Sequence, residues 1–272
     1  MTSGLSLNQA TVRKLSAPAA IELCVRHGIP GIGLWRDAVA DFGLARTAAA
    51  VRAAGIHVSS LCRGGFFTHA DPARRAAALA GNRAALAEAA ELGADTLILV
   101  SGGLPDGSRD LVAARAMIAD AIASLVPLAQ QAGVRLGIEA LHPMFCADRC
   151  AISTLGQAVE LASQFPASAV GVVVDTYHLW WDPQLPAAIE RAAGRIVSFQ
   201  LSDWVLPLPA DTLLGRGHVG DGCIDFGPIS AAVSAAGYTG FAEVEIFSQR
   251  VWDAPADQTA ATVCSRFAAL GG

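Results

Sequence analysis

Short apolar segments alternate with longer alanine-rich segments along the whole chain. The short segments are rich in β-branched residues and end in polar residues or glycine, which is typical of buried strands. Apolar residues recur at helical spacing in the longer segments, and one of these has an N-cap residue, Asp71, and a closing glycine, Gly93. We expect strands at residues 5–8, 31–34, 57–61, 96–100, 135–139, 170–175, 196–201 and 241–246.

A helix is expected after every strand, at residues 17–27, 44–54, 72–92, 110–132, 153–165, 185–193, 227–236 and 256–269. Eight such units with no segment left over favour a closed barrel over an open sheet. Several strands are apolar throughout, as strands buried on both faces are. No G-x-G-x-x-G pattern follows the first strand, which disfavours a dinucleotide-binding fold. The sequence therefore predicts an α/β fold, a single (β/α)8 TIM barrel domain over residues 1–272.

Composition narrows the class of protein. Hydrophobic residues make up 53% of the chain and charged residues 16%, which excludes a disordered chain. The net charge of −5 and the absence of a basic run argue against nucleic acid as a partner. The polar first residues lack the layout of a signal peptide, and no apolar stretch reaches the roughly 18–20 residues that span a bilayer. We therefore expect a cytoplasmic protein without a membrane partner, whose scattered cysteines are reduced thiols.

Oxygen-bearing side chains end four successive strands of the predicted barrel. They are Glu139, Asp175, Gln200 and Glu245. Because the active face of such a barrel lies at the carboxyl ends of its strands, these side chains should meet at one mouth. Carboxylates crowded in a low-dielectric mouth repel each other, and a divalent cation relieves that repulsion. Oxygen ligands of this kind suit Mn²⁺, with Mg²⁺ or Co²⁺ as alternatives.

Two further acidic residues lie near these strand ends. Glu243 has the same parity as Glu245 and should point to the same face. We expect Glu245, nearer the carboxyl end, to be the ligand, and Glu243 to lie deeper in the barrel or beside a buried cation. Asp203, just past the seventh strand, is expected to support the site.

Other residues near the mouth are candidates for substrate binding or proton handling. His142 and His178 each follow a strand end by three residues, and His142 also suits a role in ordering its own loop. The long seventh loop carries Arg216, which suits hydroxyls, a carboxylate or a phosphate, and His218. Aromatic residues cluster at the same face, and they suit either packing under loops or a wall for a sugar ring. Among them, Trp35 and Trp181 are the candidate wall residues.

Several runs of residues resemble a known family. They are G-I-E-A-L-H-P at 137–143, V-V-V-D-T-Y-H at 172–178, G-R-G-H-V-G-D-G-C-I-D-F at 215–226 and E-V-E-I-F-S at 243–248. Together with Gln200, their order is similar to that of the xylose isomerase-like TIM barrels. This superfamily includes sugar phosphate isomerases and epimerases related to tagatose 3-epimerase and hydroxypyruvate isomerase. The resemblance covers nearly the whole chain and is most specific from Glu139 to Ser248.

The resemblance implies a ligand set and a mechanism. It implies one divalent metal ion held by Glu139, Asp175, the strand-seven residue and Glu245. That residue is usually His in the sugar epimerases, whereas Gln200 matches hydroxypyruvate isomerase-like members. The two glutamates are implied to carry protons on opposite faces of a metal-bound enediolate, with His178 beside the substrate oxygens. The resemblance also implies a homo-oligomer, either a dimer or a tetramer.

These features predict a metal-dependent carbohydrate isomerase or epimerase that acts by proton abstraction next to a carbonyl. The substrate is expected to be a small sugar or keto-sugar. A lyase or dehydratase that performs β-elimination on a keto-sugar or C-glycoside is the main alternative. An apurinic endonuclease needs a histidine-rich three-zinc cluster and a basic face, neither of which the sequence suggests. A non-catalytic binding subunit is the remaining alternative, because a fold alone does not imply a function.

Overall fold

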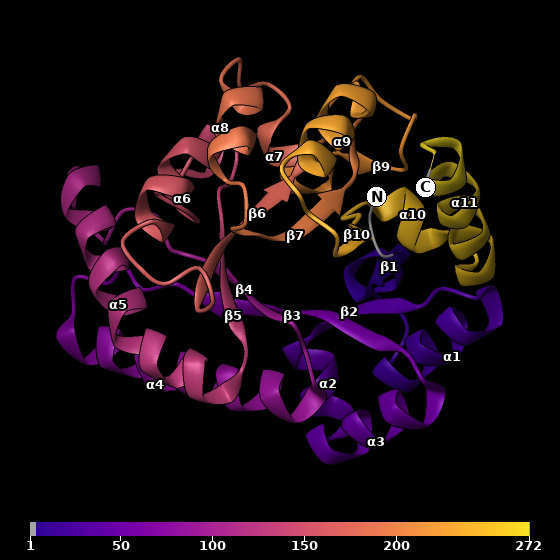
Figure 1. Cartoon of the computed structure of the whole chain (residues 1–272), viewed down its shortest axis with the longest axis horizontal. Coiled ribbons are helices and arrows are strands. Elements are labelled where there is room, and N and C mark those ends of the chain that lie inside the picture. The colour runs from indigo at the N-terminus through magenta and orange to yellow at the C-terminus, as the bar shows by residue number, and fades with distance from the viewer. Residues whose placement is uncertain (1–3, 272) are drawn as a thin grey trace.

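The computed structural model describes residues 4–271 and shows a closed barrel of parallel strands surrounded by helices (Figure 1). The strands are β1 (Gly4–Asn8), β2 (Gly31–Trp35), β3 (His57–Gly65), β4 (Thr96–Val100), β5 (Arg135–Glu139), β6 (Val170–Asp175), β7 (Ile196–Leu201) and β10 (Phe241–Val244). Neighbours follow the order β1-β10-β7-β6-β5-β4-β3-β2, and β1 pairs with β2 to close the barrel. The predicted (β/α)8 barrel is confirmed.

Long helices form the outer layer (Figure 1). They are α1 (Ala17–His27), α2 (Arg36–Phe42), α3 (Leu44–Ala54), α4 (Pro72–Leu92), α5 (Leu111–Ala132), α6 (Leu155–Ala162), α8 (Leu185–Arg191), α9 (Phe226–Ala235) and α11 (Ala256–Ala269). Shorter elements lie in the connections. They are η1 (Gln9–Val12), η2 (Pro143–Phe145), α7 (Thr176–Leu179), β8 (Asp203–Trp204), η3 (Thr212–Leu214), β9 (Arg216–Gly217) and α10 (Gln249–Asp253).

Three element boundaries differ from the sequence-based expectation in ways that matter for the site. β3 runs four residues beyond the predicted end, because Gly64 and Gly65 continue to pair with β4. β10 ends at Val244, because pairing with β1 and β7 stops there, so Glu245 is the first residue after the strand. Helix α2 begins directly after β2 and was not predicted at all.

Helix α5 corrects one expectation. An 18-residue stretch of this 22-residue helix has a mean hydropathy of 1.7, so by length and composition alone the helix qualifies as a candidate membrane span. In this structure its buried side chains include Ile118, Ile122 and Leu125, and the helix contacts α4 and β5. Its Arg115 also donates a hydrogen bond to the backbone carbonyl of Ala151. The helix therefore covers the barrel here, with one side packed inward.

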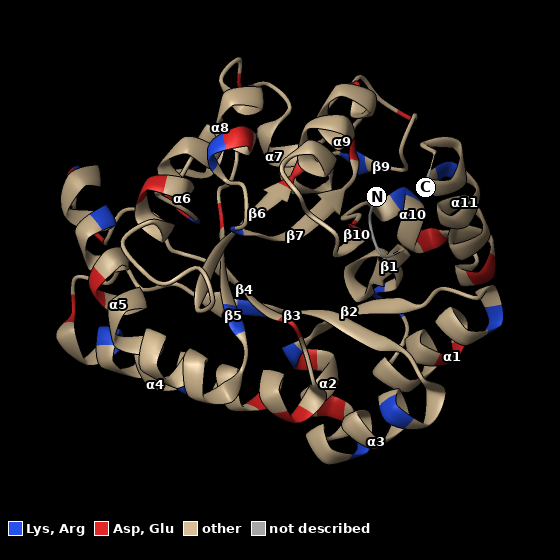
Figure 2. Ribbon diagram, viewed as in Figure 1, with Lys and Arg blue, Asp and Glu red and all other residues tan. Residues whose placement is uncertain are grey.

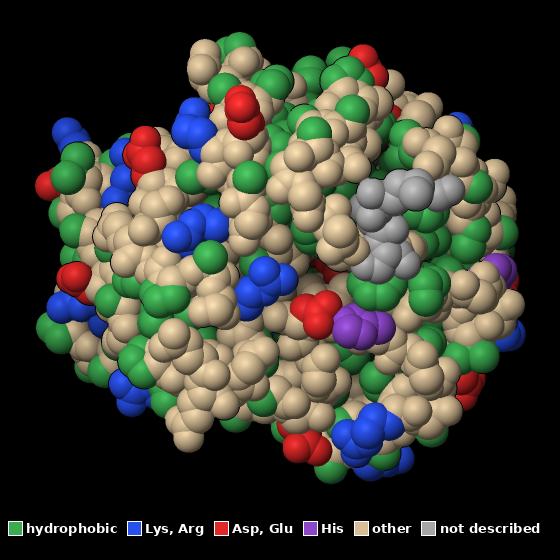
Figure 3. Space-filling view, in the orientation of Figure 1, with side chains coloured by type: hydrophobic (Ala, Val, Ile, Leu, Met, Phe, Trp, Pro, Cys, Tyr) green, Lys and Arg blue, Asp and Glu red, His purple; other side chains and the backbone are tan. Residues whose placement is uncertain are grey.

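Charged residues are spread over the outer helices, with both signs intermixed (Figure 2). On the face shown in Figure 3, Lys and Arg side chains are scattered among acidic and apolar ones. This face carries no continuous basic surface, in keeping with the net charge of −5.

Candidate active site

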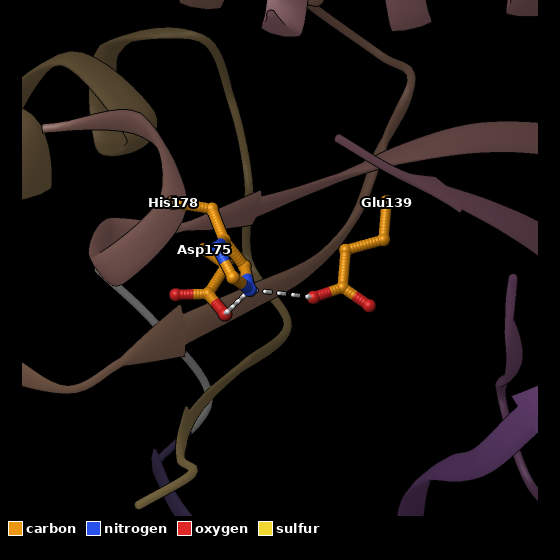
Figure 4. A group of neighbouring side chains, drawn as sticks. All are labelled: Glu139, Asp175 and His178. Carbon is orange, nitrogen blue, oxygen red and sulfur yellow. Dashed lines mark ion pairs between the residues drawn. The ribbon is translucent and has the colours of Figure 1, made fainter. Parts of the chain in front are cut away.

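Three buried side chains from β5, β6 and α7 converge at the carboxyl end of the barrel. Glu139 ends β5, Asp175 ends β6, and His178 lies in the short helix that follows. Nε2 of His178 lies 3.9 Å from Oε1 of Glu139 and 3.9 Å from Oδ2 of Asp175 (Figure 4). One ligand atom from each residue lies within 4.8 Å of the other two, so one cation can touch all three.

Arg216 connects Glu245 to this group. Its Nη1 donates hydrogen bonds to Oδ2 of Asp175 at 2.9 Å and to Oε2 of Glu245 at 3.3 Å. The guanidinium is 3% exposed, so these contacts form away from water, where charges interact strongly. Glu245 and Asp175, from opposite sides of β7 in the barrel, therefore share one cationic partner.

The loop that carries Arg216 is anchored on Asp203. In the β8–β9 ladder, Trp204 pairs with Arg216. The Asp203 carboxylate accepts hydrogen bonds from the backbone N–H groups of Gly220, Gly222 and Ile224. Asp203 thus supports the site, as expected from its position after β7.

Burial and mutual repulsion shift the titration of these acidic groups. Burial, followed by the charges of Glu245 and Asp175, raises the pKa of Glu139 well above its usual range. Burial also raises the pKa of Glu245 to about 8, although Arg216 opposes the shift. The pKa of Asp175 is raised by burial as well. Carboxyl groups with raised pKa values in one cleft are typical of acid–base sites and of sites that accept a cation.

His178 is held as a neutral imidazole. Burial and the nearby positive charge of Arg216 lower its pKa well below the usual range. Its Nδ1 lies 3.2 Å from the backbone N–H of His142 and accepts that hydrogen bond. Nε2 faces Glu139 and Asp175, and Nη2 of Arg216 lies 3.0 Å from it. Because a guanidinium can only donate and a neutral imidazole has one acceptor nitrogen, Arg216 and the backbone N–H of His142 compete for that acceptor.

Gln200 lies between the cluster and a second buried glutamate. Its backbone is in register with Asp175 on β6 and with Glu243 on β10. Its Nε2 donates a hydrogen bond to Glu243 at 3.3 Å. Its Oε1 is buried and has no hydrogen-bond partner among the described residues. A buried amide oxygen without a partner is costly, and a bound cation would satisfy it.

A cavity of about 230 Å³ opens onto these groups. Its polar lining includes Glu139, His178, Arg216 and Glu245, and Trp35 and other apolar side chains form much of the remaining wall. A larger adjoining cavity of about 360 Å³ contains none of the clustered carboxylates. The smaller cavity is therefore the candidate active site.

Five of the predicted site residues lie outside the lining of this cavity. They are Asp175 and Gln200, whose contacts are given above, and His142, Trp181 and His218. The ring of His142 contacts those of Trp181 and Trp204, and its Nδ1 accepts a hydrogen bond from the backbone N–H of Met144. Trp181 donates a hydrogen bond through Nε1 to the backbone carbonyl of His178. These two residues hold His178 through the hydrogen bonds that they donate to its Nδ1 and to its backbone carbonyl.

His218 lies in a different place from the one expected. It lines a small cavity with Val244 and with Val263 and Phe267 of α11. The loop turns back after Arg216, so His218 packs toward α11 while Arg216 enters the barrel mouth.

Sequence reasoning missed five polar residues that line the active-site cavity, which are Arg13, Asp37, Cys62, Arg63 and Arg149. Cys62 and Arg63 lie on the unexpected extension of β3, and Arg149 lies in the loop after β5. The Cys62 Sγ is 4.0 Å from Oε1 of Glu245. A longer β3 would have placed Cys62 and Arg63 at the active face, whereas no periodic pattern marks Arg149.

The chain belongs to the xylose isomerase-like TIM barrel family, because the model of this family matches residues 21–266. The crystal structure of protein SMc04130 from Sinorhizobium meliloti 1021 is similar to the whole chain. It has 46% sequence identity, a TM-score of 0.95 and coverage of 99% of both chains. The resemblance seen in the sequence is confirmed.

Two curated relatives match parts of the chain. The 3-dehydroshikimate dehydratase of Pseudomonas putida KT2440 is 30% identical over 176 residues, which cover 63% of this chain and 26% of that protein. The inosose isomerase of Bacillus subtilis 168 is 24% identical over 146 residues, which cover 53% of this chain and 51% of that protein. The matches thus span between a quarter and a half of the length of these relatives.

Proposed function

We propose that this protein is a metal-dependent enzyme that removes a proton next to the carbonyl of a small sugar or keto-sugar and returns it to give an isomer or epimer. The observation that carries this proposal is the pair Glu139 and Glu245. Both are buried, both line the same cavity, and burial raises both pKa values. A carboxylate with a raised pKa is a stronger base, which suits proton removal from carbon near neutral pH.

The proposed metal ligands are Glu139, Asp175, Gln200 and Glu245. Burial raises the pKa values of all three acidic groups, and neighbouring carboxylates raise those of Glu139 and Glu245 further. With an amide oxygen that has no partner among the described residues, they form a donor set that fits a divalent cation. Oxygen donors favour Mn²⁺, with Mg²⁺ and Co²⁺ as alternatives. When bound, the cation would supply positive charge to the substrate oxygens as negative charge develops.

The other steps are assigned to four side chains, two for proton transfer and two for binding the substrate. Glu139 and Glu245 reach the cavity from β5 and from the end of β10, which two strands separate, so they approach a substrate from different sides. One removes the proton and the other can return it. His178 and Arg216 lie in hydrogen-bond contact on the cavity wall, and the guanidinium can hold a substrate oxygen there.

Dehydration is the second candidate function, and the similarity to a 3-dehydroshikimate dehydratase favours it. The first step is the same removal of a proton by a glutamate. The C–H electron pair then forms a C=C bond, the C–O bond at the next carbon breaks, and the leaving hydroxide takes a proton from a carboxylic acid to become water. The geometry serves both outcomes, since both begin with the same carbanion chemistry.

Solvent deuterium exchange tests the shared step without assuming the product. The metal-free protein is supplied in D₂O with Mn²⁺, Mg²⁺, Co²⁺ or Zn²⁺ and with D-fructose, an inosose or 3-dehydroshikimate, and products are followed by NMR. We expect metal-dependent deuterium incorporation next to the carbonyl of at least one ketone. Isomer and eliminated product are distinguished in the same spectra.

Glu139→Gln and Glu245→Gln are the test variants, and Glu91→Gln, at an exposed position on α4, is the matched control. Loss of exchange in the first two and its retention in the third supports the assignment. Metal binding without exchange on any of the ketones contradicts it and indicates a binding protein.

A further inference from the structure

Four arginines line the active-site cavity. Arg216 is paired with Asp175 and Glu245. Arg13 packs 5.7 Å from the ring centroid of Trp252, which leaves Arg63 and Arg149. Arg63 projects from β3, and Arg149 lies in the loop after β5. Neither is a member of the acidic cluster, and neither takes part in the proton transfers proposed above. Their position on the wall makes them available to the part of a substrate that does not react.

Arg63 has no polar partner of its own. Within the described part of the chain, no hydrogen bond or ion pair holds its guanidinium; the Cζ atom lies 4.3 Å from the ring centroid of Phe66. Burial lowers the pKa of Arg63, the charges of Cys62 and Glu139 oppose this shift, and the positive charge of Arg149 adds to it. Arg63 is an exposed residue at the cavity wall. A guanidinium near another cation and without an ion-paired carboxylate among the described residues is available to an anion.

Arg149 also has a hydrogen-bond donor without an acceptor among the described residues. Its Nε is buried and makes no hydrogen bond within residues 4–271, although it lies 3.5 Å from Oδ2 of the neighbouring Asp148. Its guanidinium packs 5.7 Å from the ring centroid of Phe145. Aromatic rings therefore support both arginines, which limits their motion and leaves N–H groups free.

The acidic groups of the cavity do not neutralise this wall. Asp175 and Glu245 are already engaged by Arg216, and Glu139 belongs to the proposed metal site. Asp37 also lines the cavity, and its charge raises the pKa of Arg63, but no ion pair joins the two side chains. Once a divalent cation neutralises the acidic cluster, the charges of Arg63 and Arg149 remain, so this side of the cavity is positively charged.

We propose that Arg63 and Arg149 form a subsite for a carboxylate, so that the substrate is an acidic keto-sugar or cyclic keto acid. A guanidinium matches the planar carboxylate with two parallel N–H donors. This inference adds a substrate class to the proposed function. It rests on the proposed function only in taking the reacting group to be a ketone.

A carboxylate fits this wall better than a phosphate does. Phosphate sites in barrels typically use backbone N–H groups of glycine-rich turns or helix N-termini. Among the described residues that line the cavity, none is glycine. The donors on the wall are guanidinium groups, and the cavity of about 230 Å³ has the size of a single ring with one substituent.

The test compares a carboxylate probe with its neutral methyl ester. Shikimate carries a carboxylate on a hydroxylated ring, whereas its methyl ester is neutral; D-fructose 6-phosphate serves as the phosphate probe. Affinities are measured by calorimetry with the Mn²⁺-loaded protein. We expect shikimate to bind at least about tenfold more tightly than the ester, as a charge-assisted hydrogen bond supplies.

Arg63→Gln and Arg149→Gln should each weaken shikimate binding by about tenfold and leave the ester unchanged. Arg83→Gln, at an exposed position on α4, is the matched control and should bind like the wild type. Thermal melting of each variant shows that it is folded. Equal loss for acid and ester indicates a structural role and overturns the proposal.

The remaining outcomes are also decisive. A wild-type protein with no preference for shikimate over its ester overturns the subsite, and so does Arg63-dependent binding of the phosphate probe alone. An Arg63-dependent preference for shikimate without metal-dependent exchange on any ketone supports the subsite while the proposed reaction fails. Exchange on neutral ketones with no effect of Arg63→Gln preserves the reaction and rejects the subsite.

Discussion

Glu243 and Glu245 are two residues apart and both buried, yet their surroundings differ. Glu243 is 1% exposed, and among residues 4–271 its carboxylate accepts hydrogen bonds only from neutral groups. These are Asn8 at 2.7 Å, Ser59 at 2.5 Å, Ser60 at 2.9 Å and Gln200 at 3.3 Å. Glu245 is 4% exposed, and within the described residues its carboxylate has contacts only with Arg216 and the Cys62 thiol.

The comparison shows how one strand supplies both a support and a reactive group. Glu243 lies inside the barrel with its hydrogen-bonding capacity largely used, so it orders β1, β3 and β7 around itself. It also borders a separate cavity of about 290 Å³ that reaches Tyr238 and Gly240, away from the acidic cluster. Glu245 lies past the strand end, and its carboxylate oxygens can still accept further hydrogen bonds or a cation. A metal ligand or a base requires such free oxygens.

The largest expected effect comes from removing charge at the reactive positions. Glu245→Gln and Glu139→Gln should each lower turnover by about 10²- to 10⁴-fold, because each removes a proton-transferring group. Steady-state rates on any ketone that exchanges deuterium provide the measurement. Near-normal rates in both variants would remove the acid–base mechanism and the distinction between the two glutamates.

Replacing the supporting glutamate should act on stability instead. In Glu243→Gln, an amide N–H₂ replaces a carboxylate oxygen that faces the donors of Asn8, Ser59 and Ser60. The mismatch should destabilise the fold by about 1–3 kcal/mol, as an unsatisfied buried donor does. Urea unfolding gives this value, and Mn²⁺ binding should be retained. A loss of metal binding larger than the loss of stability contradicts the supporting role.

The sequence predicted the acidic cluster because parallel strands bring their carboxyl ends to one side. That rule placed Glu139 and Asp175 correctly, and it holds for Arg216 because its loop crosses the same mouth. It could not place His218, since the direction of a loop after its first residues depends on tertiary contacts such as those of Asp203. It also gave no way to know that Gln200 would share its amide with Glu243.

The positions of Arg63 and Arg149 at the cavity could not be predicted from the sequence, for a related reason. Arg63 is followed by two glycines, which are typical of the end of a strand, but pairing of Gly64 and Gly65 with β4 carries β3 further. Strand length here is decided by the partner strand, which local pattern does not report. Arg149 lies in an irregular loop, and only the folded structure brings it next to Arg63.

The pH dependence of stability in the metal-free protein tests the difference between Glu245 and Glu243. The pKa of Glu245 rises from its usual 4.5 to about 8 on folding. Between pH 6.5 and 8 the unfolded chain carries this group ionised while the folded protein holds it protonated, so stability falls as pH rises. The slope should be about 1.4 kcal/mol per pH unit for each such group. Urea unfolding across this window provides the measurement.

The window from pH 6.5 to 8 separates this effect from that of His178. The lowered pKa of His178 means that the folded protein resists its protonation, so its effect reduces stability as pH falls below about 6.5. Glu245→Gln should make the slope shallower, and saturating Mn²⁺ should reverse it because the metal binds the ionised groups. A slope that is unchanged by both contradicts the raised pKa of Glu245.

The smallest expected effect concerns one donor of the supporting glutamate. The hydroxyl of Ser60 donates to Glu243, and the carboxylate keeps Asn8 and Ser59 when that hydroxyl is removed. Ser60→Ala should therefore destabilise the fold by only about 1 kcal/mol. Turnover should stay close to that of the wild type, because no atom of Ser60 lines the active-site cavity. If Ser60→Ala lowered turnover as far as Glu245→Gln, Glu243 would belong to the reactive group and the division between the two glutamates would be wrong.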